Sequence, residues 1–114
     1  MWRERKRGEV RLLEPVRVEG KWTPEAACTA LEGVVAAAPG SAWVVDAARL
    51  HPIGSESLAA LIAAARIVHT AGGRLALASA PPGLARVLHA TRTGRFLPVF
   101  ADVPAALAVL GTAG

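Results

Sequence analysis

The stretch from Ala42 to Ala71 constrains the fold most, because it joins a wholly apolar strand to a long amphipathic helix. Residues 42–45 read Ala-Trp-Val-Val and are apolar at consecutive rather than alternate positions. Such a strand is covered on both faces, so we place it in the middle of a sheet. After Asp46 and a loop at Arg49–Pro52, a helix is predicted whose apolar residues recur at helical spacing: Leu58, Leu61, Ile62, Ala65 and Val68. A buried strand followed by a covering helix predicts an α/β fold.

The N-terminal third is expected to contain two strands and a helix. Short runs rich in Val and Leu predict strands at Glu9–Leu13 and Val16–Glu19, separated by Glu14-Pro15. Thr23-Pro24-Glu25 then supplies an N-cap hydroxyl, a proline at the first helical position and a first-turn acid. A helix is therefore predicted from there to Pro39-Gly40, with one apolar face directed at the sheet.

The C-terminal half continues the alternation of strands and helices. A strand is predicted at Arg74–Ala78 and another at Phe96–Phe100. Two helices are predicted from their apolar stripes: one after Pro81-Pro82-Gly83 with Leu84, Val87 and Leu88 inward, and one capped by Asp102 with Val103, Leu107 and Leu110 inward before Gly111. The whole pattern predicts a single α/β domain in which about four helices pack against a mixed central β-sheet.

The length of the chain and the distribution of its charges suggest one domain flanked by two short terminal segments. Its 114 residues, 53% of them apolar, suit one compact domain. Four of the 13 basic residues, Arg3, Arg5, Lys6 and Arg7, stand in the first seven positions. We therefore expect a basic flexible arm at residues 1–8, the domain at 9–110 and a flexible C-terminus at 111–114. With the arm set apart, the folded part is nearly neutral and poor in aromatics, so no specific nucleic-acid partner is expected.

Several other classes of protein fit the sequence poorly. The longest apolar-leaning run, residues 58–68, contains Arg66 and is shorter than the roughly 20 residues that cross a bilayer. No transmembrane segment is expected, and because a secretory signal pattern is lacking we expect a cytoplasmic protein. Cys28 stands alone on the apolar face of a predicted helix, which is typical of a small core residue. The histidines lack metal-ligand spacing, so neither a metal nor a cofactor is expected.

An enzyme is not expected either. Asp46, His51 and Ser55 could be written as a catalytic triad, but no nucleophile elbow of the Gly-x-Ser-x-Gly kind accompanies them. An Asp46 side chain that accepts backbone N–H groups of the following loop is the simpler interpretation. Binding of a nucleotide or small ligand in a loop cleft after Asp46 stays open from the sequence alone.

Four motifs, in order and at matching spacing, resemble the STAS domain of anti-sigma factor antagonists across roughly residues 9–110. They are Val44-Val45-Asp46, Ile53-Gly54-Ser55-Glu56-Ser57-Leu58, Ala71-Gly72-Gly73-Arg74-Leu75, and Gly94-Arg95-Phe96-Leu97-Pro98-Val99-Phe100. In that family the first serine of the second motif is phosphorylated by a partner kinase that is also the anti-sigma factor, and Ser55 holds this position. The chain departs from the family pattern next to it: Gly54 replaces an aspartate, Glu56 the second serine and Ser57 a glycine.

The resemblance implies a bacterial signal-transduction protein that regulates transcription by protein–protein interaction, as a phosphoprotein. The expected partner surface is Ile53, Gly54, Ser55, Glu56, Ser57 and Leu58, docking on an anti-sigma factor or serine-threonine kinase. Ser55 is the first candidate phosphoacceptor and Ser57 the second, whereas a plain helix N-cap is the alternative role for Ser55. The alternative function is a structural STAS subunit of a bacterial lipid-transport ABC complex, with a transporter subunit as partner, or of a stress-signalling scaffold. The exposed first strand, Glu9–Leu13, is also expected to allow homodimer pairing.

Overall fold

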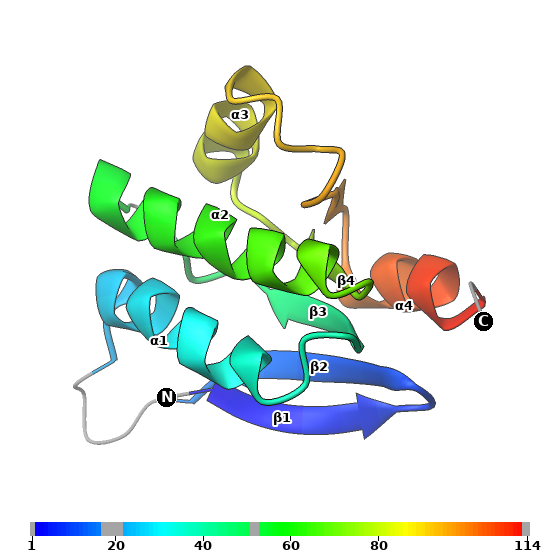
Figure 1. Cartoon of the computed structure of the whole chain (residues 1–114). Coiled ribbons are helices and arrows are strands. Elements are labelled where there is room, and N and C mark those ends of the chain that lie inside the picture. The colour runs from blue at the N-terminus through cyan, green and yellow to red at the C-terminus, as the bar shows by residue number, and fades with distance from the viewer. Residues whose placement is uncertain (1, 17–21, 51–52, 113–114) are drawn as a thin grey trace.

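The computed structural model describes residues 2–16, 22–50 and 53–112 and shows strands and helices in alternation (Figure 1). The strands are β1 (Trp2–Arg7), β2 (Val10–Pro15), β3 (Ala42–Asp46), β4 (Arg74–Ala78) and β5 (Val99–Phe100). The helices are α1 (Pro24–Ala36), α2 (Ser55–Thr70), α3 (Pro82–Ala90) and α4 (Val103–Thr112). The described part of the chain thus confirms a mixed sheet with four helices.

The five strands lie in the order β1-β2-β3-β4-β5, so the apolar strand β3 is central, as predicted. β1 is antiparallel to β2, and all other pairs are parallel. A parallel neighbour requires a crossover connection, which α1, α2 and α3 supply between β2 and β5. The parallel strands therefore all end at the same side of the sheet, where the loop leading to α2 begins.

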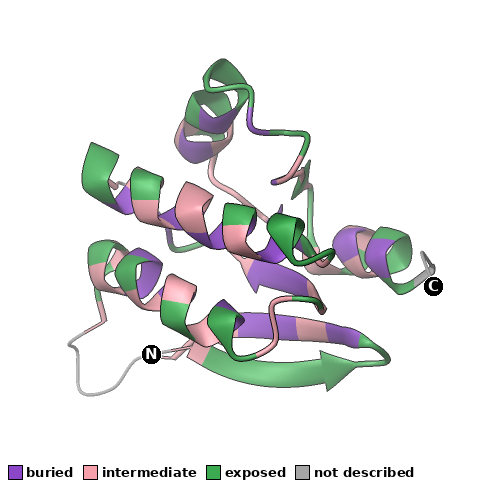
Figure 2. Ribbon diagram, viewed as in Figure 1, coloured by how far each residue is buried: buried purple, intermediate pink, exposed green. Residues whose placement is uncertain are grey.

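The two faces of the sheet are covered by different helices. On one face Trp43 and Val45 of β3 pack with Leu31 of α1 and Leu61 of α2 in the larger core cluster. On the other face, Val44 packs with apolar residues of α4: Ala106, Leu110, Val103 and Leu107. Buried positions follow the sheet and the inward sides of the helices (Figure 2). Consecutive apolar residues in β3 are thus explained by cover on both faces.

The N-terminus departs from the expected arm, because residues 2–7 form strand β1 along β2. The Nε1–H of Trp2 donates to the carbonyl oxygen of Ala27 at 2.8 Å, which ties the strand to α1. Arg11 Nη1 lies 2.7 Å from Glu4 Oε2 across the strand pair. The strand expected at Glu9–Leu13 is β2 and runs through Glu14-Pro15, so it lies inside the sheet rather than at an exposed edge. The homodimer pairing expected on that strand therefore loses its basis.

The remaining differences are local. Val16 is outside any strand, and the rest of the predicted strand Val16–Glu19 lies outside the described residues. β5 is confined to Val99–Phe100, because residues 94–97 form a turn in which Phe96 and Leu97 N–H groups donate to the Thr93 carbonyl oxygen. α4 continues through Gly111 to Thr112 instead of ending before Gly111. The cap of α4 is as predicted, since Asp102 Oδ1 accepts the Ala105 N–H at 2.8 Å.

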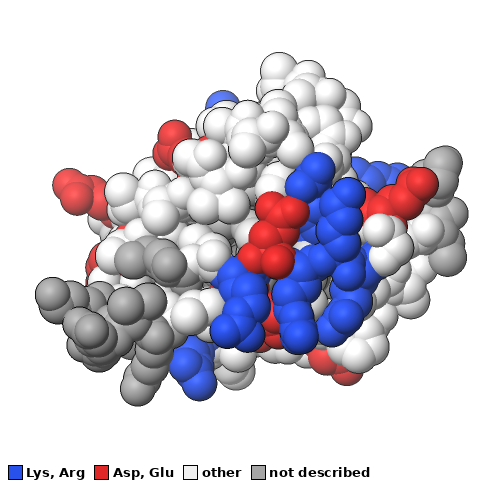
Figure 3. All heavy atoms as spheres, turned by 90° about the horizontal axis from the view of Figure 1, so that it is seen from below, with Lys and Arg blue, Asp and Glu red and all other residues white. Residues whose placement is uncertain are grey.

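The edge strand β1 concentrates positive charge. Residues 3–7 are all exposed and read Arg-Glu-Arg-Lys-Arg. The register pairs Arg5 with Leu12 and Arg7 with Val10, so these arginines share the face that α4 covers farther along the sheet. Seen from below, Lys and Arg side chains form a block crossed by acidic side chains (Figure 3). One of the ion pairs of this strand is Arg5–Glu14, at 3.5 Å.

Candidate functional site

The first turn of α2 holds the predicted site, and Ser55 is its first helical residue. Gly54 is the N-cap, with extended backbone at φ −85° and ψ 178°, and its carbonyl oxygen accepts the Leu58 N–H at 3.0 Å. No side chain caps this helix end. The plain N-cap role for Ser55 is therefore wrong: its side chain is exposed and makes no capping hydrogen bond. The hydroxyl is left accessible beside the positive end of the helix macrodipole.

The six predicted surface residues are not equally accessible. Gly54, Ser55 and Glu56 are exposed, whereas Ile53 and Leu58 are half-buried and pack against the larger core. Ser57 is only 5% exposed, because it lies on the inward side of the first turn. That burial argues against Ser57 as the second phosphoacceptor, since an enzyme could not approach its hydroxyl with α2 folded. Ser55 and Glu56 therefore carry the accessible polar chemistry here.

A shallow hollow beside Ser55 adds a part of α3 that the sequence did not assign to the site. Its volume is about 240 Å³, and it is lined by Ile53, Gly54, Ser55, Leu58, Gly83, Leu84 and Val87. Val87 was expected to point inward, yet it is 43% exposed. Leu84 and Leu88 take the inward positions of α3 instead. All three residues have helical spacing, so the sequence alone does not show that Val87 is exposed. In so short a helix the two leucines are enough to form the buried side.

The Asp46 side chain, at the end of β3, caps the loop that follows the strand. Asp46 Oδ1 accepts the Ala48 N–H at 3.2 Å, so the loop-capping interpretation is confirmed. His51, the residue that would have to join Asp46 and Ser55 in a triad, lies outside the described residues. No group of three or more His, Cys, Asp or Glu side chains that could hold a metal ion occurs among residues 2–16, 22–50 and 53–112.

Cys28 is a core residue of α1, as its position in the apolar stripe predicts. It is fully buried in the larger core. Burial, with a smaller contribution from the charge of Glu25, raises the pKa of the Cys28 thiol to about 11. A thiol in this environment stays protonated near neutral pH and is a poor nucleophile.

No helix in the described part of the chain is both long enough and apolar enough to span a bilayer. This finding agrees with the charges that interrupt the apolar runs of the sequence, such as Arg66 within α2.

Both the sequence and the fold of this chain match known proteins. The family model described as "Mlab, STAS domain" matches residues 11–99. An anti-sigma-factor antagonist (STAS) domain protein from Planctomyces limnophilus is 17% identical, with a TM-score of 0.76 over 97% of this chain and 98% of that one. The NMR structure of the protein TM1081 is 20% identical, with a TM-score of 0.73 over 98% of this chain and 90% of that one.

A crystal structure of the same TM1081 protein, a candidate anti-sigma factor antagonist from Thermotoga maritima, gives a similar result: 16% identity and a TM-score of 0.72, over 96% of this chain and 94% of that one. At these identities the solved structures establish the fold alone. No curated protein sequence matches the chain.

Proposed function

Since the chain belongs to the STAS domain family, we propose that it is a non-enzymatic regulatory module that binds a protein partner through the start of α2 and the adjacent side of α3. The partner class is an anti-sigma factor that is also a serine-threonine kinase, and Ser55 is the phosphoacceptor. One observation supports this most: the Ser55 hydroxyl is exposed, makes no capping hydrogen bond and borders an apolar hollow.

The hollow suits a small apolar side chain of a partner. The apolar walls of the hollow are formed by Val87, Ile53 and Leu58. The side chain of Val87 is 43% exposed. Burying such groups in an interface contributes roughly 25 cal/mol per Å² of apolar surface. Ser55 and Glu56 would then lie within the contact area, where a charge added to Ser55 loses its contact with water.

Phosphorylation of Ser55 would oppose this docking by electrostatics. A phosphate adds about −2 charge at neutral pH, and the N-terminus of α2 tolerates it because the macrodipole is positive there. Glu56, exposed at the next position, adds a second negative charge. An interface closing over two uncompensated anions loses binding energy, by about 3 kcal/mol when one charge is left unpaired and desolvated. The fold is thus preserved while affinity falls by about 100-fold.

The test compares Ser55→Asp and Ser55→Ala in binding to a purified anti-sigma factor kinase of the same bacterium. We expect Ser55→Ala to bind like the wild type and Ser55→Asp to bind much more weakly, and incubation with ATP to yield a phosphopeptide from residues 53–66 modified at Ser55. Thr70→Asp, an exposed position at the far end of α2, is the charge control. Equal affinity of all three variants for every candidate partner would refute the switch.

A second pair of variants tests the surface itself. Val87→Arg places a charge on the wall of the hollow, and we expect it to abolish binding without unfolding the protein because Val87 is already exposed. Val109→Arg on α4 is the matched control, since Val109 is 49% exposed and does not line this hollow. If Val87→Arg and Val109→Arg bound the partner equally well, the docking site would not be this hollow.

A permanently bound subunit is the second candidate function, and Glu56 favours it. An exposed carboxylate at the second position of α2 gives this surface a constant negative charge, with or without a kinase. In that case the partner is a transporter subunit or a scaffold protein. The complex would then survive purification, Ser55→Asp would bind unchanged, and Val87→Arg would still dissociate it.

A further inference from the structure

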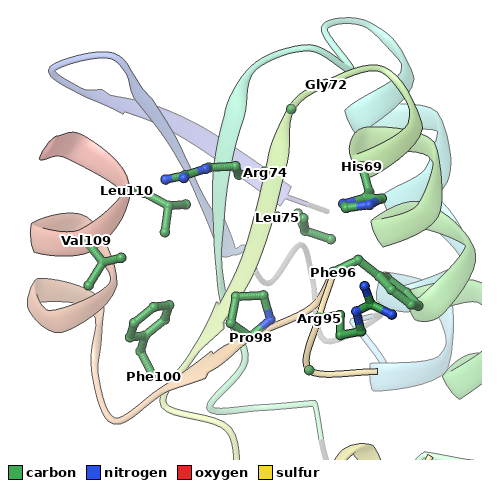
Figure 4. A pocket seen from close by; sticks show the side chains of 12 residues that line it. His69, Gly72, Arg74, Leu75, Arg95, Phe96, Pro98, Phe100, Val109 and Leu110 are labelled. Atoms are coloured by element: carbon green, nitrogen blue, oxygen red, sulfur yellow. The ribbon is translucent and has the colours of Figure 1, made fainter. Parts of the chain in front are cut away.

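A second, larger hollow lies at the opposite end of α2 and has no part in the proposed docking. Its volume is about 530 Å³, and it lies between the end of α2, the start of β4, the 94–98 segment, β5 and α4 (Figure 4). Ser55 lies fourteen residues before His69 of this pocket, which at 1.5 Å per residue is about 21 Å along the helix. The two sites can therefore be tested separately.

The pocket has an apolar interior. Val109 of α4 is 49% exposed, whereas Leu75 of β4 and Leu110 of α4, at 1% and 7%, are already covered by the protein's own packing. Phe96, Pro98 and Phe100 add half-buried apolar surface from the segment after α3. A volume of this size is in the range of pockets that enclose small organic ligands, and such pockets are mostly apolar with a few polar groups.

The charged groups around this interior all have the same sign. Arg74 and Arg95 line the pocket with exposed side chains, and the imidazole of His69 lies on the opposite side from Arg74 (Figure 4). No Asp or Glu lines it. Among the described residues, the ion pairs are Arg5–Glu14 and Arg11–Glu4, so neither guanidinium of the pocket is neutralised by a carboxylate. An arginine fork presents several N–H donors that suit a carboxylate or a phosphate.

Two features hold the walls in place. The Phe96 ring lies under the guanidinium of Arg66, whose Cζ is 5.7 Å from the ring centroid, and 6.0 Å from the ring of His69. On the other side, Gly73 packs its backbone against the turn that follows α1, where a Cβ atom would collide with backbone atoms of Gly40 and Ser41. A wall built from backbone contacts and packed rings loses little conformational freedom when a ligand binds.

We propose that this pocket binds a small anionic amphiphile: an apolar chain that lies against Pro98, Phe100 and Val109, with a carboxylate or phosphate head at Arg74. The pocket combines an apolar lining with the guanidinium of Arg74 at its mouth, which pairs with no carboxylate among the described residues, and this combination recognises a charged head on an apolar body. Arg95 adds positive potential and the His69 imidazole adds a polar contact on the other side of the opening. A fatty-acid-like carboxylate and an alkyl phosphate monoester both fit this description, since each carries an anionic head on an apolar chain.

Calorimetric titration of the full chain with four probes tests the proposal. The probes are decanoate and decyl phosphate, each below its micelle-forming concentration, with decanol lacking the charge and inorganic phosphate lacking the chain. We expect one or both charged amphiphiles to bind, and the tighter one identifies the head group. Decanol and inorganic phosphate are expected to bind at least about tenfold more weakly, because each loses one of the two contributions. Equal binding of decanol would overturn the role of the arginines.

Variants locate the site. Arg74→Gln is expected to weaken decanoate or decyl phosphate about fivefold, the effect of one partly exposed charge-assisted hydrogen bond. Arg86→Gln, on an exposed position of α3 outside this pocket, is the matched control and should leave affinity unchanged. Val109→Trp is expected to block the pocket from α4 while the fold is retained, because Val109 is 49% exposed. Wild-type affinity in both Arg74→Gln and Val109→Trp, or no binding by either charged amphiphile, would refute the proposal.

Discussion

Replacing Gly73 with alanine tests how tightly the turns after α1 and α2 pack together. A Cβ atom at this position would overlap the carbonyl oxygen of Pro39 and lie 2.5 Å from the carbonyl oxygen of Ser41 and 2.9 Å from the carbonyl carbon of Gly40. Non-bonded carbons at their optimum are about 3.5 Å apart. The opposing atoms are all backbone, so no side-chain rotation relieves the overlap, and the Arg74 N–H to Ser41 oxygen bond of 3.0 Å must shift as well.

We expect Gly73→Ala to lower the free energy of unfolding by about 3 kcal/mol, the upper end of the usual cost of overpacking. With an m-value of about 1.5 kcal/mol per M of urea, the unfolding midpoint falls by about 2 M. Fluorescence of Trp43, which is fully buried, reports the transition. The same probe serves for every variant compared below.

Gly33→Ala is the matched control for this experiment. Gly33 is an exposed residue within α1, and a Cβ added there meets no atom within 4 Å. Alanine should therefore raise stability by about 0.5–1 kcal/mol through its helix propensity. A Gly73→Ala variant within about 1 kcal/mol of the wild type would show that the two turns are not packed as described.

Three further predictions concern stability. Deleting residues 1–8 is expected to destabilise the domain by several kcal/mol, because β1 and the Trp2–Ala27 hydrogen bond are lost. An unchanged midpoint of urea unfolding would show instead that these residues are a dispensable arm. Asp102→Ala should cost about 1 kcal/mol of unfolding free energy by removing the cap of α4, whereas Asp102→Asn should retain most of it. The Cys28 thiol has a pKa of about 11 in the folded protein against an ordinary 9.0, so the thiol of the unfolded chain loses its proton first as the pH rises. Its contribution to the free energy of unfolding is therefore fully present below pH 9. Between pH 9 and 11 that free energy falls by at most about 1.4 kcal/mol per pH unit. The fall should be smaller in Cys28→Ala, and parallel pH curves for the two proteins would contradict the raised pKa.

The buried elements could be predicted from the sequence because packing leaves a periodic signal. The sequence predicts β3, β4, α1 and α2 near their observed bounds, since the two strands are short runs of consecutive apolar residues and the two helices repeat apolar residues at helical spacing. β1 gave no such signal. Its residues 3–7 are exposed, and Trp2 alone turns toward the core, so five charged positions in succession look the same in an edge strand as in an unfolded arm.

The candidate site shows a similar limit. The position of Ser55 at the start of α2 followed from the sequence, but the exposure of its hydroxyl depends on Gly54 taking the N-cap position, which lies within the usual uncertainty of a helix boundary. Val87 joins the site from α3, 32 residues later, and only the packing of the two helices brings it there. The larger pocket draws on three separate stretches of the chain, residues 69–75, 94–100 and 109–110, a convergence that no local pattern encodes.

The charge on β1 also governs how copies of the chain meet during synthesis and at high concentration. An outermost strand offers unpaired backbone groups on which another chain can stack, the usual first step toward insoluble aggregates. Here an incoming second β1 would bring Arg3, Arg5, Lys6 and Arg7 against an identical set, and the like charges repel. At the opposite border of the sheet, β5 is two residues long and too short to template such growth. The arginine-rich strand thus contributes to colloidal stability as well as to the sheet.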